Sequence, residues 1–75
     1  MDIEIFVSGL QDSLTLNGVK EITVSQKGHA PVVLKGNDIR KLAIYPDHSY
    51  TIVSCNTVHV FSGSFIQLVE FPAID

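Results

Sequence analysis

One cysteine and three histidines are the residues of this 75-residue chain best suited to chemistry: Cys55, His29, His48 and His59. Nucleophilic catalysis needs a thiol or hydroxyl, an imidazole and a carboxylate that converge in one pocket. No basic residue lies near Cys55 in the sequence to stabilise a thiolate. The glycines fall in expected turns and form no phosphate-binding loop. We therefore expect Cys55 to be a buried structural thiol and the protein not to be an enzyme.

A metal site would need several of these side chains to meet at one point. His29 and His48 fall in expected turns and His59 in an expected strand, with Asp47 and Cys55 as further donors. Their spacing matches no common ligand pattern, such as paired cysteines or histidines across a short gap. Alternation along the strands also places His59 and Cys55 on opposite faces. We expect no metal site and no cofactor.

The element that would position these residues is an uncharged stretch, residues 48–69, which contains no Asp, Glu, Lys or Arg. Residues 50–55, 57–61 and 65–71 are rich in β-branched and aromatic side chains, as strands prefer. Turns are expected near Asn56 and at Gly63, which can adopt a positive φ without steric cost. The pattern predicts a C-terminal three-stranded meander.

Both faces of this expected meander are apolar. One face would carry Val53, Cys55, Val58, Val60, Phe65, Val69 and Phe71, and the other would carry Tyr50, Ile52, His59, Phe61, Ile66 and Leu68. A chain of this length buries only ~60% of the surface it exposes when unfolded. We therefore expect one face to form the core and the other to contact a second copy. The second set is our candidate self-association face, because interfaces tolerate the polar tips of Tyr and His.

The rest of the chain reads as further short strands. Residues 2–8, 32–35 and 39–45 are strand candidates, and Asn37 or Asp38 can cap one helical turn before 39–45. Asn17-Gly18 indicates a hairpin within residues 14–24, and a short helical turn that ends at Gly18 is the competing interpretation. The expected fold is a single all-β domain over residues 1–75, a small antiparallel barrel or sandwich of about six or seven short strands. A tightly curled barrel that covers itself would need no partner.

Every basic residue lies between positions 20 and 41, namely Lys20, Lys27, Lys35, Arg40 and Lys41. One hypothesis is that this segment binds an anion or nucleic acid, as small barrels do. The chain nevertheless has a net charge of −3, and its aromatic residues lie outside the segment. We favour ordinary solvated turns and edge strands, and keep nucleic-acid binding as the alternative function.

Targeting signals are missing from the sequence. No basic region is followed by an apolar signal segment, and the uncharged stretch has the period and composition of strands. A single cysteine fits a reducing compartment. We expect a cytoplasmic, non-enzymatic protein that does not enter a membrane. It would act through protein–protein contact, as a homo-oligomer or with another protein, as an accessory or scaffold component of a larger assembly.

Overall fold

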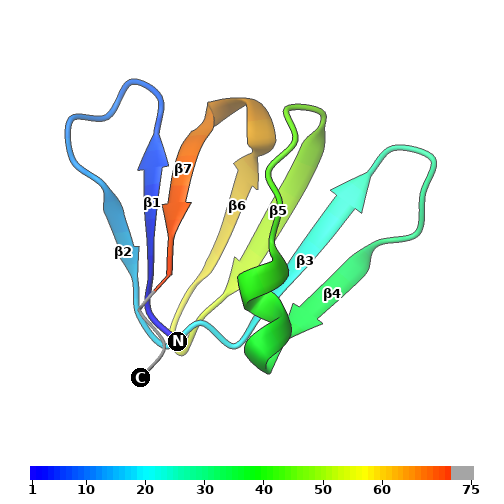
Figure 1. Cartoon of the computed structure of the whole chain (residues 1–75), viewed down its shortest axis with the longest axis horizontal. Helices are drawn as coiled ribbons and strands as arrows, with labels where there is room; N and C mark the ends of the chain where they lie inside the picture. The colour runs from blue at the N-terminus through cyan, green and yellow to red at the C-terminus, as the bar shows by residue number, and fades with distance from the viewer. Residues whose placement is uncertain (72–75) are drawn as a thin grey trace.

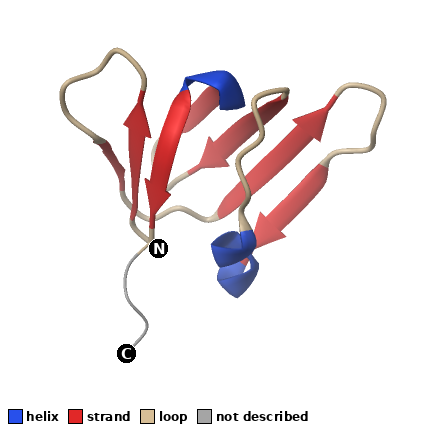
Figure 2. Cartoon of the chain, turned by 45° about the horizontal axis from the view of Figure 1, so that its top comes forward, coloured by secondary structure: helices blue, strands red, loops and turns tan. Residues whose placement is uncertain are grey.

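The structure is a computed structural model that describes residues 1–71. It contains seven strands and two short 3-10 helices, so the expected all-β class is confirmed (Figure 1, Figure 2). In chain order the elements are β1 (Ile3–Val7), β2 (Leu14–Leu16), β3 (Glu21–Gln26), β4 (Val32–Lys35), η1 (Gly36–Lys41), β5 (His48–Val53), β6 (Val58–Ser62), η2 (Gly63–Phe65) and β7 (Ile66–Glu70).

The strands form two antiparallel sheets. The first has the order β2-β1-β7 and the second has the order β4-β3-β5-β6. Within residues 1–71 no ladder joins one sheet to the other, so the barrel does not close. The fold is therefore two small sheets whose inner faces share one core.

The expected three-stranded meander is wrong at its last strand. β6 pairs with β5 as predicted, but β7 crosses to the first sheet and pairs with β1, where Phe6 is the partner of Leu68. The crossing is made by η2, whose first residue packs tightly. A Cβ added at Gly63 would overlap the carbonyl oxygen of Tyr45. The close approach of these two backbones sets where the chain leaves β6.

The expected hairpin at Asn17-Gly18 is also wrong, and so is the helical-turn alternative. β2 and β3 lie in different sheets, and residues 17–20 carry the chain from one to the other. Gly18 has a φ of 64°, a conformation that suits glycine. Two hydrogen bonds hold the crossing in place. The N–H of Val19 donates to the carbonyl of Met1 at 2.8 Å, and the N–H of Lys20 donates to the carbonyl of Val53 at 2.8 Å.

The segment that follows β4 is helical rather than extended. The helical turn expected before residues 39–45 is present as η1, although no side-chain cap is found among the described residues, and the strand expected at 39–45 is wrong because η1 extends to Lys41 and residues 42–45 form a loop. Ile39 projects from η1 into the core with 1% of its surface exposed. The loop after η1 is held by Tyr50, whose hydroxyl donates to the carbonyl of Ala43 at 2.8 Å and accepts the N–H of Tyr45 at 2.8 Å.

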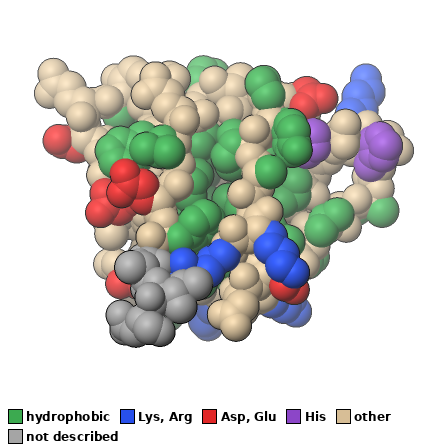
Figure 3. All heavy atoms as spheres, viewed as in Figure 1, with side chains coloured by type: hydrophobic (Ala, Val, Ile, Leu, Met, Phe, Trp, Pro, Cys, Tyr) green, Lys and Arg blue, Asp and Glu red, His purple; other side chains and the backbone are tan. Residues whose placement is uncertain are grey.

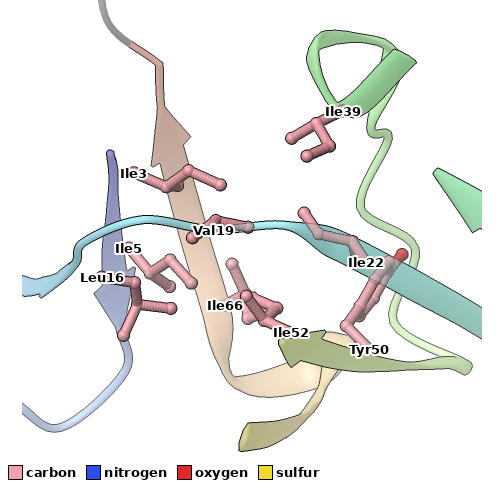
Figure 4. Close-up of a cluster of buried hydrophobic side chains, with 9 residues drawn as sticks. All are labelled: Ile3, Ile5, Leu16, Val19, Ile22, Ile39, Tyr50, Ile52 and Ile66. Atoms are coloured by element: carbon pink, nitrogen blue, oxygen red, sulfur yellow. The ribbon is translucent and has the colours of Figure 1, made fainter. Parts of the chain in front are cut away.

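The core is a single cluster between the two sheets (Figure 4). Its buried members are Ile3, Ile5, Leu16, Val19, Ile22, Ile39, Tyr50, Ile52 and Ile66. Cross-strand pairs line it from the second sheet, where Ile22 lies beside Ile52 and Val24 beside Tyr50. Fully burying each large apolar side chain contributes roughly 1.5–3 kcal/mol before entropy is counted.

Candidate protein-contact surface

The single cysteine lies on the surface, contrary to the prediction of a buried thiol. Cys55 belongs to the turn between β5 and β6 and is exposed, with its Sγ donating to the carbonyl of Gly18 at 3.6 Å. The same turn and β2 line a shallow groove of about 370 Å³. Cys55 and His59 both line this groove, so the prediction that they lie on opposite faces is wrong as well.

The groove lacks the parts of a nucleophilic site. None of the described residues that line it is a carboxylate. The hydroxyl of Ser54 is used within the turn, because it lies 2.8 Å from Thr57 Oγ1 and donates to the Thr57 carbonyl at 3.1 Å. The imidazole of His59 stacks on Phe61 with ring centroids 6.0 Å apart. The groove therefore presents a thiol and an imidazole without a carboxylate to orient the imidazole.

The other histidines lie apart from the groove. His48 Nδ1 is 2.8 Å from Asp47 Oδ1, and its ring lies 4.9 Å from that of Tyr45. The hydrogen bond with His48 holds the pKa of Asp47 below its ordinary value. His29 is exposed in the turn after β3. Residues 1–71 contain no group of three or more His, Cys, Asp or Glu side chains that could hold a metal ion.

The structure does not bring the six residues of the candidate self-association face together on the outside. Tyr50, Ile52 and Ile66 are 0%, 1% and 8% exposed and belong to the core. His59 and Phe61 are half-buried on the same inner side of the second sheet, and Leu68 is exposed on the other sheet. The choice of outward face was therefore wrong for the second sheet. Its inner face is fixed by contact with the first sheet and by the hydrogen bonds of the Tyr50 hydroxyl.

The opposite face of the second sheet is open and carries many β-branched side chains. One cross-strand row runs from β4 to β6 through Val33, Thr23, Thr51 and Val60. A second row contains Lys35, Glu21, Val53 and Val58. Val33, Val58 and Val60 are 49%, 62% and 70% exposed, and Phe65 on η2 is also exposed. This outer face is one of the places where the monomer leaves apolar side chains uncovered.

The second sheet ends at β6, whose far edge faces the first sheet: β7 lies on that side of β6 (Figure 1), and β2 lines a groove with Thr57 and His59. Ser54 N–H donates to the Thr57 carbonyl at 2.9 Å, which marks these two residues as a hydrogen-bonded pair. Hydrogen-bonded and non-hydrogen-bonded pairs alternate along an antiparallel ladder. In the β5–β6 register, His59 and Phe61 therefore bond to β5. The N–H and C=O groups of Val58, Val60 and Ser62 point away from β5, where no described strand pairs with them.

The other edge strands have features that disfavour pairing with a further strand, whereas β6 does not. β4 follows Pro31 and ends at Lys35, which forms an ion pair with Glu21 at 3.7 Å. β2 is only three residues long, and β7 ends at Glu70. Charges, prolines and short length are the usual protection of sheet edges. The sequence of β6, Val-His-Val-Phe-Ser, has none of them over five residues.

Four of the five basic residues lie toward one end of β3, and the fifth lies at the other end. Lys20, Lys35, Arg40 and Lys41 belong to elements that meet at one end of β3, whereas Lys27 follows its other end, roughly 20 Å along a strand of this length. Figure 3 likewise shows most Lys and Arg side chains near the lower margin of the molecule and one apart at the upper right. Lys41 pairs with Asp38 at 3.2 Å, and Lys35 pairs with Glu21. Two of the five cations are therefore already engaged by carboxylates.

Comparisons with protein-family models, with curated proteins and with solved structures found no match. Over the described residues, no helix is both long and apolar enough to cross a membrane.

Proposed function

We propose that this protein is a non-enzymatic small β module that acts through protein–protein contact. It self-associates and serves as an accessory or scaffold component of a larger assembly. The observation that carries the proposal is the uncharged outer strand β6, in which Val58 and Val60 are 62% and 70% exposed. These side chains offer a partner apolar surface on the outer face of the second sheet.

On the outer face of the second sheet, Thr51 and Thr23 lie between the exposed Val60 and Val33, and Val53 lies beside the exposed Val58. Exposed apolar side chains gain free energy when a partner removes them from water, about 25 cal/mol for each Å² covered. Several exposed apolar side chains on one face are typical of contact sites on small proteins. A partner on this side would bury apolar surface without disturbing the core.

Two further features support a binding role in a reducing compartment. The groove beside β6 presents Cys55 and His59 without a described carboxylate, and the Ser54 hydroxyl is engaged in its turn, which supports a non-enzymatic protein. An exposed cysteine without a partner in the chain persists in the reduced state most readily in the cytoplasm. We infer that the protein works there.

Two matched substitutions test the proposal. Val60→Lys places a charge on the exposed edge strand, and Leu68→Lys places the same charge on an exposed leucine of the other sheet. We expect wild type and Leu68→Lys to sediment as the same oligomer and Val60→Lys to sediment as a smaller species. Thermal unfolding of all three proteins checks that each is folded. A Val60→Lys variant that keeps the wild-type sedimentation coefficient would refute the proposed surface.

A further inference from the structure

We propose that Asn17 is a site of spontaneous covalent modification, at which its side-chain amide becomes a carboxylate through a cyclic imide formed with the nitrogen of Gly18. The site lies at the crossing between the two sheets and plays no part in the proposed contact function. Asparagine is a thermolabile residue. A glycine that follows it hinders imide formation least, because glycine has no Cβ to crowd the attacking nitrogen.

The folded chain leaves this dipeptide open to water. Asn17 is exposed, follows the last residue of β2 and lines the groove between β2 and the β5–β6 turn. Gly18 also lies outside the strands, with a φ of 64°. Its N–H donates to an exposed side chain and not to a backbone carbonyl of either sheet. The attacking nitrogen is therefore not held in a ladder.

The carboxylate of Asp2 is placed to take the proton of that nitrogen. The N–H of Gly18 donates to Asp2 Oδ1 at 3.0 Å. An amide nitrogen attacks a carbonyl carbon effectively only as it gives up its proton, and a general base acts from within hydrogen-bond distance. Asp2 is held there because it precedes β1 and follows Met1, whose carbonyl accepts the N–H of Val19 at 2.8 Å.

The reaction needs only water besides the chain itself. The nitrogen of Gly18 forms a bond with Cγ of Asn17 as its proton passes to Asp2, and the Cγ–Nδ2 bond then breaks. The departing nitrogen takes a proton from water and leaves as ammonia, Asp2 returns its proton to water, and a cyclic imide remains. Water opens the imide at either carbonyl. One opening gives an ordinary aspartate, and the other gives an isoaspartate, in which the main chain runs through the side-chain Cβ and Cγ.

Modification here would weaken the link between the two sheets. Leu16 and Val19 are core residues, each 5% exposed, and only Asn17 and Gly18 lie between them. An isoaspartate lengthens the main chain of this short span by a methylene group, so the two core residues no longer fit their places without strain. Either product also adds a negative charge beside Asp2, in a chain whose net charge is already −3. We therefore expect the modified protein to unfold at a lower urea concentration.

Peptide mapping of the wild-type protein after incubation at neutral pH tests the site. Two further asparagines, both exposed, are internal controls, since Asn37 precedes Asp38 and Asn56 precedes Thr57. The residue after each control carries a Cβ that crowds the attacking nitrogen. We expect aspartate and isoaspartate to accumulate at position 17 well before the other two positions. No modification at position 17, or equal rates at all three positions, would overturn the proposal.

Asp2→Asn separates the base from the hydrogen bond. The amide oxygen of asparagine still accepts the N–H of Gly18, but an amide does not take up a proton near neutral pH. We expect the modification at position 17 to be several-fold slower in this variant, while the urea midpoint of the fresh protein changes little. An equal or higher rate would overturn the role of Asp2 and leave Asn17 as the modified residue.

Asn17→Gln tests the consequence for stability. The longer side chain of glutamine must close a larger ring to react, so this variant should keep its urea midpoint during incubation. Over the same period the midpoint of the wild-type protein should fall as isoaspartate accumulates. An equal fall in both proteins would overturn the link between this modification and the stability of the crossing.

Discussion

Glu4 on β1 and Glu70 on β7 are register partners, so two exposed carboxylates stand directly opposite each other on the outer face of the first sheet. Like charges in this position destabilise a ladder by a few tenths of a kcal/mol up to about 1 kcal/mol. We predict that Glu70→Lys raises the free energy of unfolding by about that amount. Glu4 is left unchanged because its Oε2 accepts the hydroxyl of Ser13 at 3.1 Å.

Urea unfolding at low and high salt measures this effect. The gain in Glu70→Lys should shrink as salt rises, because screening weakens interactions between exposed charges. Asp12→Lys in the β1–β2 loop is the control, since it makes the same charge change away from the ladder. Equal stabilisation of both variants would mean that net charge, and not the Glu4–Glu70 pair, is responsible.

A second prediction concerns the buried hydroxyl of Tyr50. Tyr50→Phe removes the group that bonds the carbonyl of Ala43 and the N–H of Tyr45, and leaves both without that partner. Losing one partner of a buried polar group costs about 1–3 kcal/mol. We expect a loss of that size in chemical unfolding. Tyr45→Phe is the control, because Tyr45 is an exposed side chain and should change stability little.

The same side chain predicts how stability changes at high pH. Burial raises the pKa of Tyr50 above its ordinary value of 10.0. The folded state therefore holds this proton more tightly than the unfolded state. The resulting stability is fully present below about pH 10, the pKa of an unfolded tyrosine, and is lost as the pH rises through the raised value.

Urea midpoints between pH 8 and pH 11 check this pH dependence. The wild-type midpoint should fall over the upper part of that range, and the slope should be shallower in Tyr50→Phe. An equally steep decline in the variant would assign the alkaline sensitivity to other groups.

A further prediction concerns the turn that sends β7 to the first sheet. Gly63→Ala would place a methyl group against the carbonyl oxygen of Tyr45, so the backbone must move. Overpacking of this kind typically costs about 1–3 kcal/mol. Gly9→Ala is the control, because nothing lies within 4 Å of its added Cβ and only the strain of a positive φ remains. If Gly63→Ala costs no more than Gly9→Ala, the close packing of η2 does not fix the crossing.

Most of the strands and the β5–β6 pairing could be predicted from local pattern, whereas the pairings of β2 and β7 could not. β1 and the β5–β6 hairpin follow alternation and turn chemistry, which act over neighbouring residues. The crossing at Gly18 depends on the distant carbonyl of Met1, and the departure of β7 depends on the backbone of Tyr45. Neither contact leaves a signal in the residues around the turn.

For a related reason, the sequence alone does not determine which face of the β5–β6 hairpin points outward. Tyr50 and Val60 both lie on apolar faces of the same hairpin, so composition does not separate inside from outside. The two hydrogen bonds that the Tyr50 hydroxyl makes with the loop after η1 decide which face is buried. This loop lies within the strand that the sequence predicted at 39–45. A prediction of that loop would have indicated that Tyr50 is buried, and the face that carries Tyr50 would then be the inner one.

The most direct test of the central claim is the solution mass of the wild-type protein, measured by light scattering after size exclusion over a dilution series. Self-association through the outer face of the second sheet predicts at least twice the chain mass of 8.2 kDa at high concentration, and a fall toward the monomer on dilution. A mass of one chain at every concentration would contradict self-association.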